Sequence, residues 1–414
     1  MAIRLWAAAT VLFTLITAPG VLAQQDTQGK VQGQDPNGPT QAVAAATTLP
    51  PVDEPGFIDK AKNWAQDHQL MERLSGDIDG WYPRLGGMTR GGGFAFGPGY
   101  RFHWWNDVLV DLSVGISTKT YKAADIKVRW LQAFDERLEL WTNYRYEDFP
   151  QEDYFGRGMS SLKDNRTSYD FDSQQILALG LFRPVRWLQL GTELGYMTPD
   201  IGEGSDNNYP SLEQIFPDAQ APGLIEQPGY LHTTFFAGID YRDQPGRPRS
   251  GGFYHVAMGF WNDRTLERYD FKRFDANFSQ YVPLDTEKRH VLLGRVGVAY
   301  VNNETGSRVP FYFLPYVGGV DTVRSFHEFR FRDENALWMT AEYDLTLIKW
   351  VSVATFVDAG KAAPDWQDVN LTGLKHGYGF GVRVHSNRQT FARFDVGGGG
   401  GEGWRAFLKL GSAF

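Results

Sequence analysis

Apolar and polar side chains alternate over residues 108–118. Every second position is apolar: Val108, Val110, Leu112, Val114 and Ile116. The positions between them are mostly small or polar, as at Asp111 and Ser113. A period of two is that of a β-strand, whose successive side chains point to opposite faces. The pattern therefore predicts a strand with one apolar face and one polar face.

Similar alternation recurs from residue 81 to the end of the chain and predicts sixteen strands. They span 81–89, 93–104, 108–118, 121–133, 137–147, 166–182, 186–198, 230–242, 252–262, 269–283, 289–302, 335–348, 350–360, 376–386, 389–397 and 403–414. The connections that follow even-numbered strands are short. The long connections, at about 148–165, 199–229, 303–334 and 361–375, all follow odd-numbered strands.

This sorting of loops by length separates two architectures that share alternating strands. A soluble β-sandwich has no reason to place its long loops at one end. A membrane barrel with both termini in the periplasm has short inner turns and long outer loops. The sequence therefore predicts an all-β fold, a 16-stranded antiparallel transmembrane β-barrel over residues 80–414, preceded by a short N-terminal helix.

The last twelve residues, Gly403–Phe414, end the chain on an aromatic residue. Leu408, Leu410 and Phe414 share one face at alternate positions. This pattern is typical of the closing strand of an outer-membrane barrel, with one face in hydrocarbon and the other in a polar lumen. We expect these three residues to form a signal that the barrel-assembly machinery reads during biogenesis.

The N-terminal residues do not continue the strand pattern. Residues 1–23 combine Arg4, an apolar stretch and a Val-Leu-Ala end, which predicts a signal peptide. Residues 24–55 are rich in Gln, Pro, Ala, Thr and Gly and predict a disordered linker. Residues 57–74 carry apolar side chains at helical spacing and predict one amphipathic helix. Its place, on the membrane surface, in the lumen or against the periplasmic rim, stays open.

Composition narrows the chemistry further. The chain contains no cysteine, which excludes disulfides, thiolate nucleophiles and cysteine zinc sites. Aromatic residues make up 15% of the chain, as expected of a barrel with aromatic girdles at both membrane interfaces. The net charge of −8 is mild and spread out, so no nucleic-acid partner is predicted. Outer-membrane lipid is the expected surrounding.

Several ordered motifs resemble a known family. Residues 318–326 read GGVDTVRSF, residues 356–360 read FVDAG, and residues 377–384 read GYGFGVRV. Residues 240–243 read DYRD and precede Pro248 at a turn. Together these motifs resemble those of the BamA/TamA surface-antigen superfamily of bacterial outer-membrane barrels, over about residues 80–414.

The resemblance implies a fold and a range of functions. Members that insert barrels or secrete proteins usually carry periplasmic POTRA domains, and the residues before the barrel here cannot encode one. We therefore expect a barrel-only form, which needs a periplasmic helper or a passenger polypeptide. Where the family's VRG[FY] motif has glycine, this chain has Ser325, which predicts a differently shaped loop tip.

The resemblance also implies a pairing inside the barrel. In the family, the arginine of the outer-loop motif, here Val323, Arg324, Ser325 and Phe326, folds inward onto acidic residues of the lumen. The alternation places Glu342 and Asp358 on the lumen faces of adjacent strands. We expect Arg324 to pair with Asp358 and Glu342 as a structural latch, hydrated and adding about 1 kcal/mol. Residues 397–401 are five glycines and predict a flexible hairpin.

No catalytic, cofactor-binding or metal-binding residues are predicted. Motifs such as GxSxG, HExxH and the Walker A loop are absent, and the eight histidines have no metal-ligand spacing. The leading hypothesis is a non-enzymatic barrel that assists insertion or translocation of a polypeptide or lipid across the outer membrane. A passive pore or surface antigen, and a lipid-acting enzyme whose triad comes from distant positions, remain alternatives.

Overall fold

The computed structural model describes residues 79–410 apart from 87, 90, 106, 134–136, 304–305 and 387–388. The predicted signal peptide (1–23), linker (24–55) and amphipathic helix (57–74) lie outside the described residues, as does Phe414. These four assignments stay predictions.

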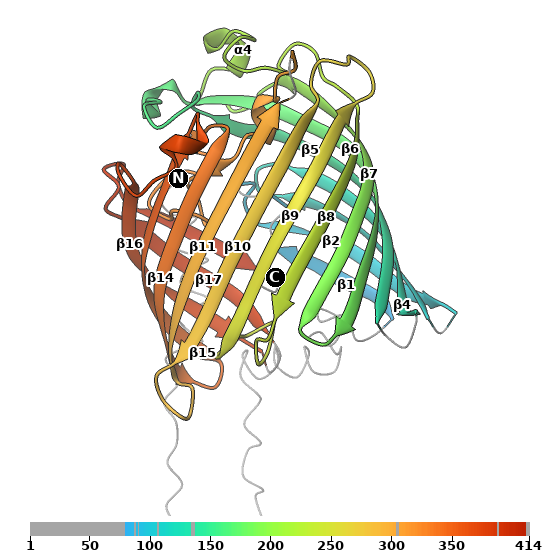
Figure 1. The fold of residues 1–414 in the computed structure, drawn as a ribbon, viewed down its shortest axis with the longest axis vertical. Helices are drawn as coiled ribbons and strands as arrows, with labels where there is room; N and C mark the ends of the chain where they lie inside the picture. The colour runs from blue at the N-terminus through green and yellow to red at the C-terminus, as the bar shows by residue number, and fades with distance from the viewer. Residues whose placement is uncertain are drawn as a thin grey trace, which may run out of the picture. The chain divides into compact units, whose positions relative to one another are not determined.

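Sixteen strands form one antiparallel sheet that curls into a nearly closed barrel (Figure 1), and each strand pairs with the next one along the chain. The strands of this sheet are β1 (Gly80–Gly86), β2 (Ala95–Trp104), β3 (Val108–Ser117), β4 (Lys122–Ala133), β5 (Leu138–Tyr154), β6 (Thr167–Val185), β7 (Leu188–Glu203), β8 (Tyr230–Asp240), β9 (Gly251–Asp263), β10 (Phe271–Pro283), β11 (His290–Asn303), β14 (Asn335–Ile348), β15 (Val351–Ala363), β16 (Lys375–His385), β17 (Thr390–Gly398) and β18 (Arg405–Leu410). The predicted fold class and strand number are confirmed.

The remaining elements are short and lie in the long loops. They are β12 (Tyr316–Val317), β13 (Phe331–Arg332), the helix α4 (Leu212–Ile215) and the 3-10 turns η1 (Lys163–Asn165), η2 (Phe311–Phe313) and η3 (Trp366–Asp368). None of the helices in the described part of the chain is long and apolar enough to cross a membrane.

The alternation in β4 shows which strand face is the lumen. Ile126 points outward and is 47% exposed, whereas Asp125 lies between two arginines, 2.7 Å from Arg84 of β1 and 2.6 Å from Arg145 of the neighbouring β5. Lys127, on the same face as Asp125, places its ammonium 4.9 Å from the ring centre of Trp141. Polar partners across strands therefore line the interior, and the apolar face meets lipid.

Strand β5 extends seven residues beyond its predicted end at residue 147. The sequence of residues 147–153 is acidic and contains Pro150, which favours a loop. In the structure Pro150 lies at a register shift between Phe149 and Glu152, where a missing N–H donor is tolerated. The extension carries Asp153, which pairs with Arg166 at 2.9 Å, so its charge is compensated.

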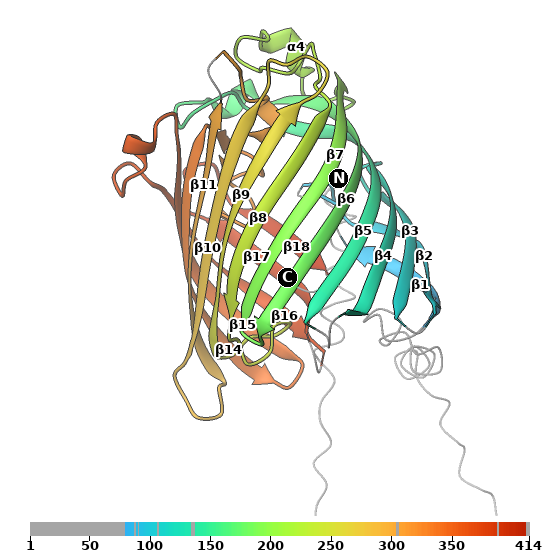
Figure 2. The same ribbon diagram turned by 45° about the vertical axis from the view of Figure 1, so that its right-hand side comes forward.

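The long loops pack together at the outer end of the barrel, around α4 at the top of Figures 1 and 2. Loop 199–229, loop 303–334 and the adjoining strand ends share a buried and largely aromatic core. Its members are Tyr154, Tyr169, Ile201, Leu212, Phe216, Ala221, Leu224, Tyr230, Tyr269, Phe271, Val301, Val309, Phe311 and Leu314. These loops are therefore a packed roof with its own apolar core.

At the opposite end, the turn between β8 and β9 reaches strands far along the sheet. The carbonyl of Gly246 accepts a hydrogen bond from the backbone N–H of Thr390 (2.9 Å), and Arg247 donates to the carbonyl of Lys349 (3.0 Å). Asp243 organises the turn. Burial alone would raise its pKa, but backbone N–H donors and Lys288 outweigh burial and lower the pKa to about 2.

The assignment of the two faces of β4 predicts opposite outcomes for adjacent residues. Ile126→Lys places a charge on the lipid face and should lower the free energy of unfolding by about 2–4 kcal/mol. Lys127→Val removes only a lumen cation–π contact, worth about 0.5–1 kcal/mol. Denaturant-induced unfolding in lipid vesicles measures both variants. A larger loss for Lys127→Val would mean that the two faces are inverted.

Candidate functional site

The tip of the outer loop 303–334 folds into the barrel between β12 and β13. Its residues Val323, Arg324, Ser325 and Phe326 are each buried to at least 98%. Val323 and Phe326 pack in an apolar cluster with Phe331 and with residues of the barrel wall. The packing of Val323 and Phe326 thus places Arg324, which lies between them in the sequence, against the inner wall of β14–β17.

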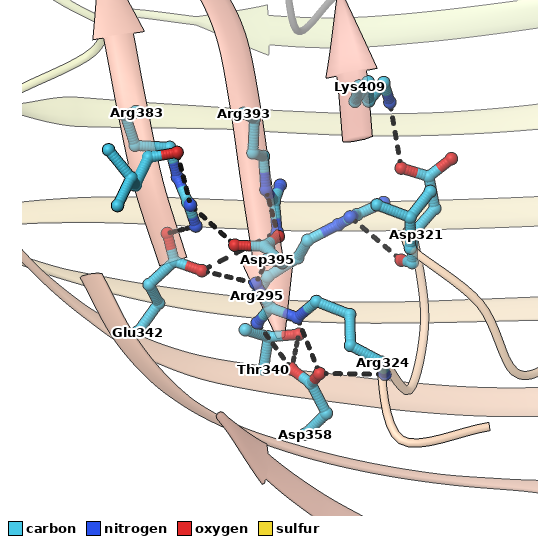
Figure 3. Close-up of polar contacts among 12 residues, drawn as sticks. Arg295, Asp321, Arg324, Thr340, Glu342, Asp358, Arg383, Arg393, Asp395 and Lys409 are labelled. Carbon is cyan, nitrogen blue, oxygen red and sulfur yellow. Dashed lines mark hydrogen bonds and ion pairs between the residues drawn. The ribbon is translucent and has the colours of Figure 1, made fainter. Parts of the chain in front are cut away.

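The guanidinium of Arg324 holds two carboxylates from adjacent strands (Figure 3). Its Nε and Nη2 donate to the two oxygens of Asp358 on β15, at 2.7 and 2.8 Å. Its Nη1 donates to Oε2 of Glu342 on β14 at 2.7 Å. The planar fork of arginine allows this bidentate geometry, which a lysine could not reproduce. The three residues that the sequence assigned to one site therefore lie in direct contact.

Further groups orient Asp358 and Arg324. The backbone N–H of Arg324 and the hydroxyl of Thr340 also donate to Asp358, at 3.1 and 2.9 Å. The ring centre of Phe356 lies 3.3 Å from the guanidinium carbon of Arg324. Phe356 and Asp358 lie two residues apart on β15 and point to the same side of it. This strand therefore contacts both the flat face of the guanidinium, through Phe356, and its N–H edge, through Asp358.

Sequence reasoning missed half of this cluster. Asp395 on β17 lies 3.4 Å from Nη1 of Arg324 and accepts from Arg383 of β16 at 2.6 Å. Arg383 also donates to Glu342 at 2.9 Å, and Arg393 pairs with Asp395 at 2.5 Å. Arg383 belongs to the GYGFGVRV motif, and Asp395 alternates with outward Phe394 on its strand. The predicted lumen positions of Arg383 and Asp395 were the signal by which the sequence could have assigned them to this cluster.

The six charges are balanced, and all of them except Arg393, whose side chain is 20% exposed, are at most 8% exposed. Three arginines face three carboxylates, and the side chains of Arg324 and Asp358 are 2% and 0% exposed. The expectation of a hydrated pair is therefore wrong, because loop 303–334 itself covers the cluster. Removing one member of a buried ion pair leaves an uncompensated charge and typically costs about 3–5 kcal/mol.

Glycines make room for the loop tip. A Cβ on Gly377 of β16 would lie 2.1 Å from Oγ of Ser325, and one on Gly397 would lie 2.4 Å from the carbonyl oxygen of Arg324. A Cβ on Gly400 would lie 2.5 Å from the ring of Phe326. Two members of the five-glycine run, expected to be only flexible, therefore allow close approach. Ser325 is not among the described non-glycine residues with positive φ, so no φ strain follows from it.

The loop also contacts the last strand. Asp321, three residues before Arg324, accepts from Lys409 of β18 at 3.0 Å, and its carbonyl accepts from Arg295 of β11 at 3.1 Å. Leu408, by contrast, points outward and is 57% exposed. Leu410 is half-buried on the same strand. Leu408 and the Lys409 contact with the loop thus occupy opposite faces of β18.

Two other groups of polar side chains resemble reactive sites. Oγ of Ser352 lies 2.9 Å from Nε2 of His385, but Ser352 is fully buried and donates to Asp344 at 2.7 Å, which leaves no room for a substrate. Asp148, Asp170 and Asp172 have carboxylate oxygens within 4.8 Å of one another. Asp148 already pairs with Lys122, and no second feature marks an ion site.

Comparison with known proteins gives one family and one fold. The family model described as the Omp85 superfamily domain matches residues 163–398. The barrel is similar to BamA from Haemophilus ducreyi lacking POTRA domains 1–3, with 14% identity and a TM-score of 0.56 over 81% of this chain and 69% of that one. It is also similar to CdiB from Escherichia coli, with 12% identity and a TM-score of 0.50 over 79% of this chain and 60% of that one. The chain thus spans less than two thirds of CdiB.

Arg324→Ala should free loop 303–334 while the barrel stays folded. The loss of a buried ion-pair member should cost the inserted state about 3–5 kcal/mol, which raises the open population more than 100-fold. Limited proteolysis within the loop measures this opening. Arg308→Ala, in the same loop but at a half-exposed pair with Asp218, is the control and should change little. Equal cleavage of both variants would show that apolar packing alone holds the loop.

Gly377→Val should displace the loop tip from β16 without touching any charge. The new Cβ would overlap Ser325, so the tip must withdraw and lose its contacts with β14–β17. Gly294→Val is the matched control, because a Cβ on this β11 glycine meets no atom within 4 Å. Protease sensitivity of the loop should rise several-fold in the first variant only. An unchanged rate for Gly377→Val would contradict the tight fit.

Proposed function

Because this chain belongs to the Omp85 superfamily, we propose that it assists the insertion or translocation of a polypeptide or lipid across the bacterial outer membrane. The family match covers the strands and the loop that build the Arg324 cluster. Barrels of this superfamily are outer-membrane proteins that act as translocators and insertases. A periplasmic helper or a passenger polypeptide is the partner this role requires, and the barrel-assembly machinery is the partner expected during biogenesis.

The observation that carries this proposal is the seam between the first and last strands. The sheet order begins at β1 and ends at β18, and no ladder pair joins these two strands among the described residues. The edges are nevertheless close, since a Cβ on Gly86 would lie 3.3 Å from the carbonyl oxygen of Leu410. Adjacent strand edges without a ladder are templates for pairing with an incoming strand.

The inserted loop supports a role for this seam. Lys409 ties Asp321 to β18, and the Arg324 cluster reaches Asp395 on β17, the neighbour of β18. The loop therefore holds the C-terminal side of the seam in place. We assign Arg324, Asp358 and Glu342 the role of a structural latch that fixes this side while the β1 side moves.

The two alternatives have less support. A passive pore needs an open path, and the packed loops place an apolar core at the outer end of the barrel. A lipid-acting enzyme needs an accessible nucleophile, and Ser352 is fully buried beside its histidine. The strongest alternative is a surface antigen without cargo. Such a protein would require the packed outer loops of the roof but no open seam between β1 and β18.

Locking the seam tests the proposal. The Cβ of Leu410 would lie 3.9 Å from a Cβ at position 86, within the range for a disulfide, and the chain has no native cysteine. The double variant Gly86→Cys with Leu410→Cys should, when oxidised, lower insertion of an unfolded client barrel into proteoliposomes to the level of empty vesicles. Reductant should restore it.

Single-cysteine variants control for the positive φ at Gly86 and for labelling. The measurement is the amount of heat-modifiable, folded client. If the oxidised and reduced double variants insert client equally well, the seam is not the route. If the wild type inserts nothing and instead gives reproducible single-channel conductance, the pore alternative replaces this proposal.

A further inference from the structure

The loop between β15 and β16 (residues 364–374, the β15–β16 loop) presents two large apolar side chains outside the barrel. Trp366 is 54% exposed and Leu371 is 72% exposed. In Figure 2 the orange segment with the single helical turn η3 stands away from the barrel wall beside β11. Unlike loops 199–229 and 303–334, this loop contributes no residue to the buried core of the roof.

Internal hydrogen bonds give the β15–β16 loop a fixed shape. Oδ1 of Asn370 accepts from the backbone N–H of Thr372 at 3.0 Å, and Lys361 donates to Asn370 and to the carbonyl of Thr372 at 3.2 and 2.9 Å. Residues 366–368 form η3. Trp366 and Leu371 are therefore held outward by an ordered backbone.

Trp366 continues the lipid-facing surface of the barrel. Its ring meets the ring of Tyr300 edge to face, with centres 6.0 Å apart. Tyr300 lies near the outer end of β11, on the same face as the exposed Leu292 and Val296. The loop thus bends over the outer end of the strands and extends the apolar belt just beyond them.

Charge and composition identify what covers this surface. The loop itself carries two acidic residues, Asp365 and Asp368, and Lys361 and Lys375 at the adjoining ends of β15 and β16 offset their charge. Tryptophan and tyrosine are favoured where lipid meets water, because each has a large apolar ring and a polar atom. An ordered loop whose acidic charge is offset by lysines beside it, and which is joined to the aromatic girdle, fits the surface of a lipid leaflet.

We propose that the β15–β16 loop is a membrane-surface anchor, with Trp366 and Leu371 inserted into the interface of the outer leaflet. This goes beyond the proposed function, and it rests only on the placement of the barrel in a membrane. The consequence is local. Strands β15 and β16 carry Asp358 and Arg383, so the anchor fixes the depth of the wall against which the loop tip packs.

Spin labelling tests the anchor directly, because an introduced cysteine is the only one in the chain. The full chain carrying Leu371→Cys is labelled and reconstituted into phospholipid vesicles containing lipopolysaccharide. Ile225→Cys is the matched control, since Ile225 is also 72% exposed but lies in loop 199–229 of the roof. The measurement is the accessibility of each label to oxygen, which concentrates in lipid, and to a water-soluble nickel complex.

The ratio of oxygen accessibility to nickel accessibility should be at least several-fold higher for the label at position 371 than for the label at position 225. Adding Trp366→Ser should move the label at 371 toward the nickel side, whereas Leu162→Ser, at another exposed loop leucine, should not. Equal nickel access at 371 and 225 would overturn the anchor. So would a label at 371 that becomes shielded from both reagents as protein density rises, because a second copy would then cover the loop.

Failure of the anchor is distinguishable from failure of the proposed function. The labelling experiment reads only contact with lipid, and it needs neither a client nor a moving seam. A labelled protein that inserts client normally but exposes residue 371 to water would reject the anchor alone.

Discussion

The burial of one positive charge governs the arrangement of this barrel. Arg324 lies within a dry part of the lumen, where an uncompensated guanidinium would cost several kcal/mol. Compensation requires carboxylates from three strands, Glu342, Asp358 and Asp395, at positions fixed by the sheet register. The surplus negative charge is then balanced by Arg383 of β16 and Arg393 of β17. Loop 303–334, strands β14–β17 and their glycines are therefore one interdependent unit.

This unit makes the barrel asymmetric around its circumference. The wall from β14 to β17 is tied by ion pairs and by the inserted loop, and the β8–β9 turn adds contacts to Lys349 and Thr390 at the other end. Among the described residues, the wall at β1 has a ladder on one side only. Local stability follows the number of buried contacts, so β1 is the part of the wall that opens at least cost. That asymmetry fits the insertion through a seam that we propose.

The pattern of period two was sufficient for the strand number, for the faces of β4 and for the lumen positions of Glu342 and Asp358. A strand fixes the direction of each side chain from its parity alone, so these features are local. Local reasoning failed where strands leave the membrane. Residues 148–154 continue β5 because they pair with the start of β6, and Asp153 meets Arg166 just before that strand; composition cannot reveal these contacts. The same limit hid Asp395, whose partners include Arg383 of another strand and Arg324 of loop 303–334.

The sequence by itself determined the class of fold, the sorting of long and short loops and the motif that carries Arg324. These follow from alternation and from residue identity, which need no neighbour in space. Only the tertiary structure decided that the arginine is dry, that Gly377 and Gly397 are spacers for the loop tip, and that Trp366 rests on Tyr300. Burial and close approach depend on what other segments bring to the same place, and the chain reaches those places only when the sheet has curled.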